Sequence, residues 1–250
     1  MSMPTATHYG TKHDTPDDRD HRYEAPPAEL PPSVDLRSAC GAVYTQGMIR
    51  SCSAHALASA LTFLERKRGG PVVLPSRLFM YYNARAITKQ TADDSGATIR
   101  DAIKALHASG ACDESLWPYD AANVTVAPPS TCYENATMHA LQYARIAQDD
   151  VSHARACLAE GYTFVLGIEI YHDALHALDQ SGHLAPPTST DTFLAGHAVM
   201  AVGYDANART FTALNSEGPS WGDGGYFTFD EAYVTDPKLA FDLWTIRKVG

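Results

Sequence analysis

The fold of this chain is decided by the stretch Gln46-Gly47-Met48-Ile49-Arg50-Ser51-Cys52-Ser53-Ala54, which places a cysteine directly before a predicted helix. Residues 54–68 are rich in alanine and leucine and end at two glycines, so a helix is expected there with Ser51 as its N-cap. A thiol at the start of a helix lies near the positive end of the helix dipole, which favours the thiolate. The stretch therefore predicts a reactive cysteine.

A histidine and an asparagine follow in the second half of the chain. His197 begins a strand-like run 145 residues after Cys52, and Asn215 closes another such run. An imidazole beside a thiol promotes the thiolate, and an amide behind the imidazole holds it in the useful tautomer. The spacing is typical of a nucleophile and a base carried by two different parts of one fold.

Five fragments, spread over residues 33–247, resemble the papain family of cysteine peptidases, most of all bacterial members in which Gln-Gly precedes the cysteine by four further residues. The fragments are Val34-Asp35-Leu36-Arg37; Gln46-Gly47 with Ser51-Cys52 and Ala54; Glu114-Ser115-Leu116-Trp117-Pro118-Tyr119; Gly196-His197-Ala198-Val199 with Val202-Gly203-Tyr204; and Asn215-Ser216 with Trp221-Gly222 and Gly225-Tyr226. One such fragment is weak evidence, but five in the family's order are specific.

The resemblance implies a role for each of four residues. Cys52 is the expected nucleophile, and His197 is the expected general base that later protonates the leaving amine. Asn215 is expected to orient the imidazole through its side-chain carbonyl. Gln46 is expected to form the oxyanion hole together with the backbone N–H of Cys52.

Two further residues are expected at the substrate cleft. Gly96 is predicted to line the cleft and to offer backbone hydrogen bonds to an extended peptide, with a simple turn or helix entry as the alternative. Trp221 is predicted to pack near the Asn215–His197 pair, with a plain core aromatic as the competing interpretation.

The sequence departs from the family pattern around the predicted site. Ser53 and His55 replace the usual aromatic residues after the nucleophile, and Arg50 replaces a glycine before it. Glu217 stands where the family usually has a tryptophan. A carboxylate there would shield the His–Asn contact less than an indole and would raise the pKa of the imidazole.

The periodicity of the chain changes near its middle. Helices are predicted at residues 54–68, 76–86, 98–109 and 150–160, and strands at residues 162–170, 198–204, 210–214, 225–230 and 240–247. Helices thus dominate residues 45–135 and strands dominate residues 140–250. This agrees with the α+β, papain-like fold that the resemblance implies, in which a helical domain faces a β-barrel-like domain across a cleft. Residues 33–250 are the predicted catalytic domain.

Residues 1–32 differ from the rest of the chain. They hold six prolines, many charges and almost no aliphatic side chains, so they cannot fold alone and are expected to be extended. Papain-like enzymes commonly carry a long helical propeptide, which this short arm cannot provide. We hypothesise that the arm lies across or near the cleft and limits access to it. A disordered tail with no regulatory role is the alternative.

Composition excludes several classes of partner. The formal net charge of −10 disfavours nucleic acid, whose phosphates need a basic surface. No apolar run is long enough to span a membrane. No metal-ligand spacing or phosphate-binding loop is visible, so no cofactor and no metal are expected. His172 and His176 lie four residues apart but lack a third ligand. A monomer acting on a peptide or protein substrate is expected.

The chain has five cysteines, and four remain if Cys52 is catalytic. A disulfide among Cys40, Cys112 and Cys132 is one hypothesis, and reduced, buried thiols are the other. Cys157 is expected to be a buried free thiol. Residues 1–32 show no secretory signal, so the localisation stays open.

The predicted function is hydrolysis of peptide bonds by a cysteine-type peptidase through an acyl-enzyme. Deamidation or transamidation of a protein side chain uses the same three groups and is the alternative. A non-catalytic binding module on the same scaffold is disfavoured, because such a module has no need of Cys52, His197, Asn215 and Gln46 together.

Overall fold

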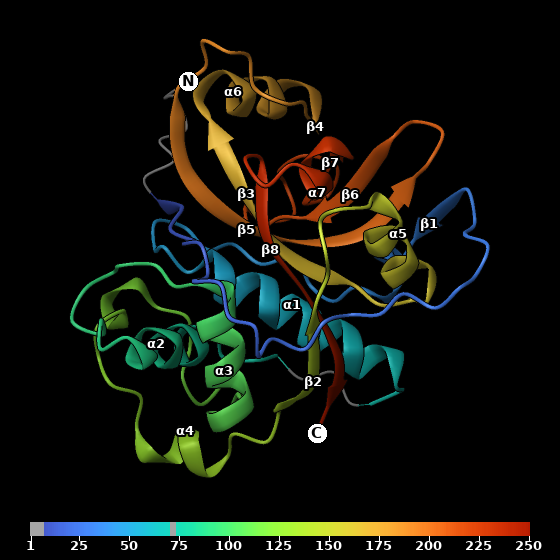
Figure 1. Cartoon of the computed structure of the whole chain (residues 1–250). Coiled ribbons are helices and arrows are strands. Elements are labelled where there is room, and N and C mark those ends of the chain that lie inside the picture. Colours follow the sequence, from blue (N-terminus) through green and yellow to red (C-terminus); the bar gives the residue numbers. More distant parts are fainter. Residues whose placement is uncertain (1–7, 71–73) are drawn as a thin grey trace.

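The computed structural model describes residues 8–70 and 74–250, so the first seven residues of the predicted arm lie outside the described residues. Figure 1 shows a helical part, which holds α2, α3 and α4, below a sheet-containing part. Helix α1 lies between the two parts and packs against both.

The longest helix of the helical part begins at the predicted reactive cysteine. The elements of this part are η2 (Arg37–Ala39), α1 (Cys52–Lys67), α2 (Arg77–Ile87), α3 (Ile99–Ser109), η3 (Ala121–Asn123) and α4 (Ser130–Glu134). Every residue of α1 from Cys52 to Glu65 is buried, which explains its alanine-rich sequence. The side chain of Ser76 caps α2 by accepting from Phe79 N, and that of Thr98 caps α3 by accepting from Asp101 N.

The second part is built on one sheet. Its strands are β1 (Ser33–Asp35), β2 (Ala140–Arg145), β3 (Phe164–Tyr171), β4 (His183–Leu184), β5 (Phe193–Asp205), β6 (Thr210–Leu214), β7 (Tyr226–Asp230) and β8 (Ala240–Val249). The strand order is β2-β8-β3-β5-β6-β7-β4, and β1 pairs with β5. Helices α5 (Val151–Ala159), α6 (His172–Ser181) and α7 (Ala232–Thr235) accompany the sheet. The antiparallel register Met200↔Leu214 between β5 and β6 brings the end of β6 close to His197 on β5.

The four predicted helices and five predicted strands correspond to α1, α2, α3, α5, β3, β5, β6, β7 and β8, with most ends within two residues. Strand β5 starts five residues earlier than predicted. Sequence reasoning missed the two other longer elements, α6 and β2. Helix α6 directly follows β3 without a break residue, and exposed side chains alternate irregularly along β2.

All five cysteines are free and buried, so the disulfide hypothesis is wrong. Cys112 and Cys132 lie together in a small cluster with Phe79. Burial raises the pKa of Cys40 to about 11 and that of Cys157 to about 11, which keeps both as inert thiols.

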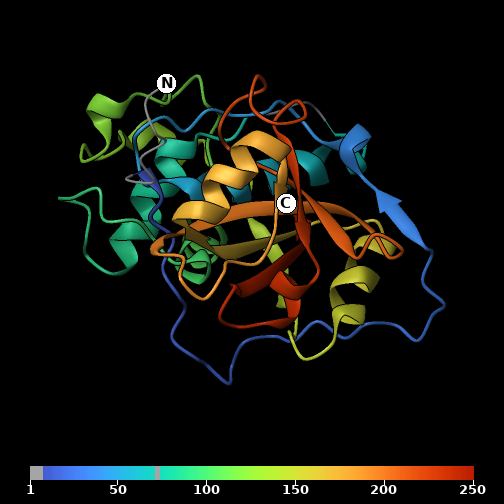
Figure 2. The same ribbon diagram turned by 90° about the horizontal axis from the view of Figure 1, so that it is seen from above.

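The arm follows an extended path over the enzyme body. Figures 1 and 2 show it in dark blue, running along the boundary of the two parts before it reaches β1. Arg22 forms a parallel bridge with Arg145, at the end of β2, and Tyr23 N donates to Arg145 O at 2.8 Å. The arm is thus tied by backbone pairing to the sheet that it crosses.

Candidate active site

Cys52 is the first residue of α1 and is fully buried. Two contacts fix the turn before it: the Ser51 hydroxyl lies 2.6 Å from the Tyr119 hydroxyl and 3.2 Å from His55 Nδ1. Burial lowers the pKa of His55 to about 3, so this histidine stays neutral. The thiol therefore sits on a rigid helix end.

His197 and Asn215 form a second rigid pair. His197 Nε2 lies 2.8 Å from Asn215 Oδ1, and Ser216 N donates to the same Oδ1 at 2.8 Å. Since a backbone N–H can only donate, that side-chain atom is an oxygen, and Nε2 must carry the proton it shares with it. The other ring nitrogen, Nδ1, is buried and has no hydrogen bond of ordinary geometry within the described ranges. This nitrogen is left for the thiol.

The thiol and the imidazole change each other's pKa. Burial alone would raise the pKa of Cys52, but His197 and the Thr11 hydroxyl lower it to about 6. Burial would lower the pKa of His197, yet interactions with Cys52 and Asn215, followed by Glu217, raise it. The two shifts have the directions that favour a thiolate beside an imidazolium.

Gln46 is buried beside this pair. Its Nε2 donates to His8 O at 3.0 Å and to Ile49 O at 3.1 Å, and its Oε1 accepts from the Ser216 hydroxyl. Its backbone N also donates to Ser216 O at 2.8 Å. The amide is thus held by the segment that carries Asn215, with one N–H aimed at a carbonyl of the arm.

The arm lies directly against Cys52, His197 and Gln46. Thr11 Oγ1 lies 2.9 Å from Cys52 Sγ, and the Tyr9 ring lies 4.0 Å, between centroids, from the His197 ring. Both arm residues are buried. The thiol and the imidazole are therefore covered by Thr11 and Tyr9 of the arm.

Glycines on both cleft walls allow the arm to lie this close. A Cβ added to Gly96, whose φ is +73°, would lie 1.8 Å from Gly10 O, and one added to Gly196 would lie 2.4 Å from Thr11 O. Thr11 N donates to Gly196 O at 3.1 Å, and Lys12 N donates to Ala97 O at 3.3 Å. The arm thus passes between the walls as an extended peptide.

The two predicted cleft residues have different surroundings. Gly96 contacts the arm, but its own N–H donates to the Tyr81 hydroxyl at 2.9 Å. Trp221 packs edge-to-face on Phe227, and its Nε1 donates to Asp179 at 3.1 Å. Neither the ring contact nor the hydrogen bond of Trp221 involves the Asn215–His197 pair.

Sequence reasoning did not identify His8, Tyr9 and Thr11 as residues of the site. His8 Nε2 lies 2.9 Å from Glu217 Oε1, the carboxylate that replaces the family's usual tryptophan. The composition of the arm gave no signal for these positions, because their contacts depend on where the backbone runs.

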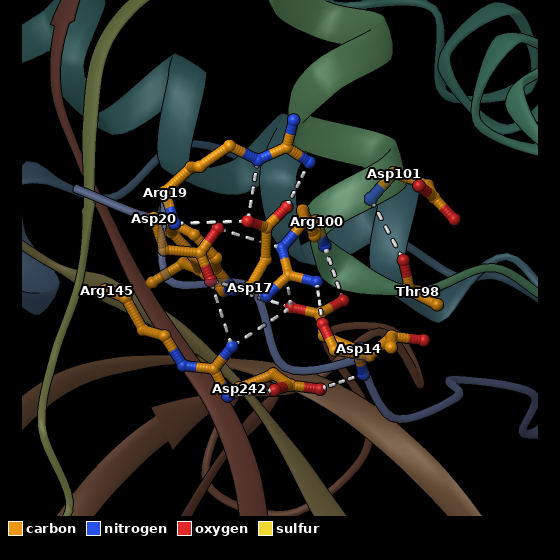
Figure 3. Close-up of polar contacts among 11 residues, drawn as sticks. Asp14, Asp17, Arg19, Asp20, Thr98, Arg100, Asp101, Arg145 and Asp242 are labelled. Atoms are coloured by element: carbon orange, nitrogen blue, oxygen red, sulfur yellow. Dashed lines mark hydrogen bonds and ion pairs between the residues drawn. The ribbon is translucent and has the colours of Figure 1, made fainter. Parts of the chain in front are cut away.

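The arm is anchored a few residues further on by a buried cluster of charges (Figure 3). Three carboxylates, Asp14, Asp20 and Asp242, share the guanidinium groups of Arg100 on α3 and Arg145 on β2. We call these five residues the anchor cluster.

Asp14 is the most buried member of the anchor cluster. Its side chain is fully buried, and it accepts from Trp244 Nε1 at 2.9 Å and from Arg100 N at 3.1 Å. Burial and the neighbouring Asp242 raise the pKa of Asp14 in spite of these bonds. The cluster therefore joins the arm to a helix, to β2 and to β8 at once.

Within residues 8–70 and 74–250, no three histidine, cysteine or acidic side chains gather in a way that could hold a metal ion. His172 lies 2.9 Å from Asp173, and His176 lies 3.0 Å from Gln180. In the same ranges, no helix is long and apolar enough to cross a membrane.

A buried thiol at a helix start, facing a histidine that is bonded to an asparagine, is the arrangement of a thiol hydrolase. The sequence model of the papain family cysteine protease matches residues 30–237. An uncharacterized peptidase C1-like protein, L477, of Acanthamoeba polyphaga mimivirus is 38% identical over 214 residues, which cover 82% of this chain and 69% of that protein. The chain belongs to the papain family of cysteine proteases.

Solved structures agree. The structure of xylellain, a cysteine protease from Xylella fastidiosa, matches with a TM-score of 0.90 and 38% identity, and the match covers 100% of this chain and 99% of xylellain. Digestive procathepsin L 3 of Tenebrio molitor, at 20% identity, shares the fold with a TM-score of 0.73 over 96% of this chain and 76% of its own. The predicted papain-like α+β fold and cysteine-peptidase class are confirmed, and the deamidase or transamidase alternative is not favoured.

Proposed function

We propose that this protease hydrolyses peptide bonds of a peptide or protein substrate through an acyl-enzyme on Cys52. The thiolate attacks the peptide carbonyl carbon, and the C–N bond breaks as imidazolium His197 gives its proton to the leaving amine. Water then attacks the thioester while His197 takes its proton, which releases the carboxylic acid and restores the thiol. Asn215 keeps the imidazole in place during both transfers.

The observation that carries this proposal is the geometry of a buried thiol at the start of α1 that interacts with His197, whose Nε2 lies 2.8 Å from Asn215 Oδ1. The thiol pKa is lowered to about 6 although the side chain is fully buried, and the imidazole pKa is raised although it is buried as well. Burial alone would do the opposite to each group, so both shifts favour an ion pair suited to nucleophilic attack.

Gln46 is proposed to stabilise the oxyanion together with the backbone N–H of Cys52. Its Nε2 already donates to a carbonyl oxygen, that of His8. A substrate carbonyl held at that place would gain negative charge during attack, and a buried, fixed N–H stabilises such charge without reorganising.

The arm is proposed to hold the intact chain in an inhibited state. It covers the thiol with Thr11, the imidazole with Tyr9 and the amide of Gln46 with the His8 carbonyl. A substrate needs the same three groups. The arm must therefore leave the cleft before a peptide can enter.

The test uses the whole folded chain with a recognition sequence for a site-specific protease in place of the exposed residues 26–29. After cutting, the released arm is removed by gel filtration, and hydrolysis of an unfolded protein is compared with that of the uncut chain. We expect rapid cleavage by the cut enzyme, little by the uncut chain, and none by cut Cys52→Ala.

The outcomes separate the two parts of the proposal. Equal rates before and after cutting would overturn the inhibitory role of the arm. Absence of hydrolysis in the cut enzyme, together with no epoxysuccinyl inhibitor adduct on Cys52, would overturn the peptidase mechanism itself.

A further inference from the structure

Glu217 lies in the catalytic cleft, two residues after Asn215, yet the mechanism above does not use it. The backbone of the segment that carries it is held by pairing with residues 44–46. Thr45 and Glu217 form an antiparallel β-bridge, Gly218 N donates to Tyr44 O at 2.9 Å, and Gln46 N donates to Ser216 O. The carboxylate is therefore placed by the same contacts that place Gln46.

The arm shows what this carboxylate binds. His8 Nε2 lies 2.9 Å from Glu217 Oε1, with the two side chains only 11% and 22% exposed. Burial would raise the pKa of Glu217, but the hydrogen bond from His8 and the nearby His197 lower it. An ionised, largely buried carboxylate that is complemented by a basic ring is a recognition site for a basic side chain.

The surroundings of this position are acidic. The pKa of Tyr9 is raised mainly by burial, and the negative charges of Glu217 and of Asp179 on α6 raise it further. Asp179 is already bonded to Trp221 Nε1 at 3.1 Å. The His197 imidazole also lowers the pKa of Glu217, but it is engaged with Cys52 and Asn215. Departure of the arm leaves Glu217 without the His8 ring and the Tyr9 hydroxyl.

We propose that Glu217 is a specificity-determining residue that binds the basic side chain of the substrate residue lying where His8 lies in the intact chain. A neutral residue there would leave a partly buried carboxylate without a partner, which costs binding free energy. Histidine, lysine or arginine at that one position would restore the ion pair. This inference rests on the proposed peptidase function and names the class of substrate that the cleft prefers.

The test is a cleavage profile of the cut enzyme on a mixed peptide library, read by mass spectrometry and counted from the broken bond. We expect basic residues to be enriched at a single position. In Glu217→Gln, the ratio of kcat/KM for peptides with a basic residue there to those with glutamine should fall about tenfold. In Glu217→Arg, acidic residues should be enriched at the same position.

Asp179→Asn is the matched control, since it removes another carboxylate that acts on Tyr9. The ratio of kcat/KM for basic over glutamine peptides should change less in Asp179→Asn than in Glu217→Gln, because Asp179 is engaged with Trp221. A uniform fall in rate for all peptides in Glu217→Gln, with the enrichment intact, would overturn the proposal and assign Glu217 to positioning of the imidazole. No cleavage by the cut wild-type enzyme would instead overturn the proposed function.

Discussion

The two halves of the arm attach to the enzyme body by different means. Residues 8–13 lie in the cleft and contact it through backbone hydrogen bonds, a small hydroxyl, ring contacts and two histidine–carboxylate pairs, His8–Glu217 and His13–Glu169. Residues 14–23 lie outside the cleft and hold on through the anchor cluster and a short strand pairing. The first half covers the reactive groups, and the second half supplies charges that are buried only while the arm is docked.

We infer from this division that the proposed inhibition has two parts, covering by residues 8–13 and holding by residues 14–23. A peptide that lies in a protease cleft through backbone contacts alone resembles any substrate and leaves easily. Removing one partner of a buried ion pair costs about 3–5 kcal/mol because the other charge stays buried and uncompensated. The anchor cluster should therefore control how long the cleft stays closed.

The largest effect is expected from the double substitution Asp14→Asn with Asp20→Asn. It leaves Arg100 and Arg145 with Asp242 as their only carboxylate in the cluster, so docking should weaken by roughly two to three orders of magnitude. The hydrolysis rate of the uncut chain should rise toward that of the cut enzyme.

Asp17→Asn is the matched control for this variant. Asp17 pairs within the arm with Arg19, whose side chain is exposed, and the pair does not bridge to the enzyme body. Its hydrolysis rate should stay within about twofold of the wild type, because exposed pairs contribute little. Equal activation by both variants would mean that general negative charge, and not the anchor cluster, holds the arm.

Substituting Gly10 by valine should have an intermediate effect, because it disturbs the half that lies in the cleft. A Cβ on Gly10 would lie 2.6 Å from Arg50 Cβ, so the arm must shift away from the wall. Overpacking of this kind costs about 1–3 kcal/mol, which corresponds to roughly 5- to 150-fold more open enzyme. The rate of hydrolysis by the uncut Gly10→Val chain, compared with the uncut wild type, measures this increase in open enzyme.

The cut form of Gly10→Val is its internal control, because the substituted residue leaves with the arm. Its kcat/KM should equal that of the cut wild type. If the uncut Gly10→Val chain is as slow as the uncut wild type, the backbone of the arm does not lie against Arg50 in solution.

Parts of this structure could be predicted from the sequence and parts could not. Helix α1 has a local signal, the alanine-rich run closed by two glycines, and the residues around Cys52, His197 and Asn215 lie in short, specific motifs. The anchor cluster has no such signal. The arm holds Asp14, Asp17, Asp18 and Asp20 within seven residues, and only tertiary contacts distinguish Asp14 and Asp20, which pair with Arg100 and Arg145, from the other two.

The sequence supports the hypothesis that the arm lies across or near the cleft, but it does not predict which arm residues contact which cleft residues. Proline and charge content indicates an extended backbone but carries no information on the surface that binds it. Backbone hydrogen bonds such as Thr11 N to Gly196 O depend on position and not on side-chain type. Helix α6 was missed for a related reason, since the chain passes from β3 into it without a glycine or proline.

The smallest effect is expected from Thr11→Val, which keeps the shape of the side chain and removes one hydroxyl. A thiolate can only accept, so the Thr11 hydroxyl, 2.9 Å from Cys52 Sγ, donates to it in that form, which favours the thiolate and lowers the pKa of the thiol. Without it the pKa of Cys52 in the uncut chain should lie above about 6, so less thiolate is present just above pH 6. The ultraviolet absorbance of the thiolate, corrected with Cys52→Ala, measures this.

The same variant should weaken docking by one hydrogen bond, or about 0.5–1.5 kcal/mol, and so speed hydrolysis by the uncut chain about two- to tenfold. Thr11→Ser, which keeps the hydroxyl, should retain the wild-type thiol pKa. A thiol pKa in Thr11→Val equal to that of the wild type would show that the hydroxyl covers Cys52 without bonding to it. In that case the arm blocks the nucleophile only by occupying space, while His197 alone sets its ionisation.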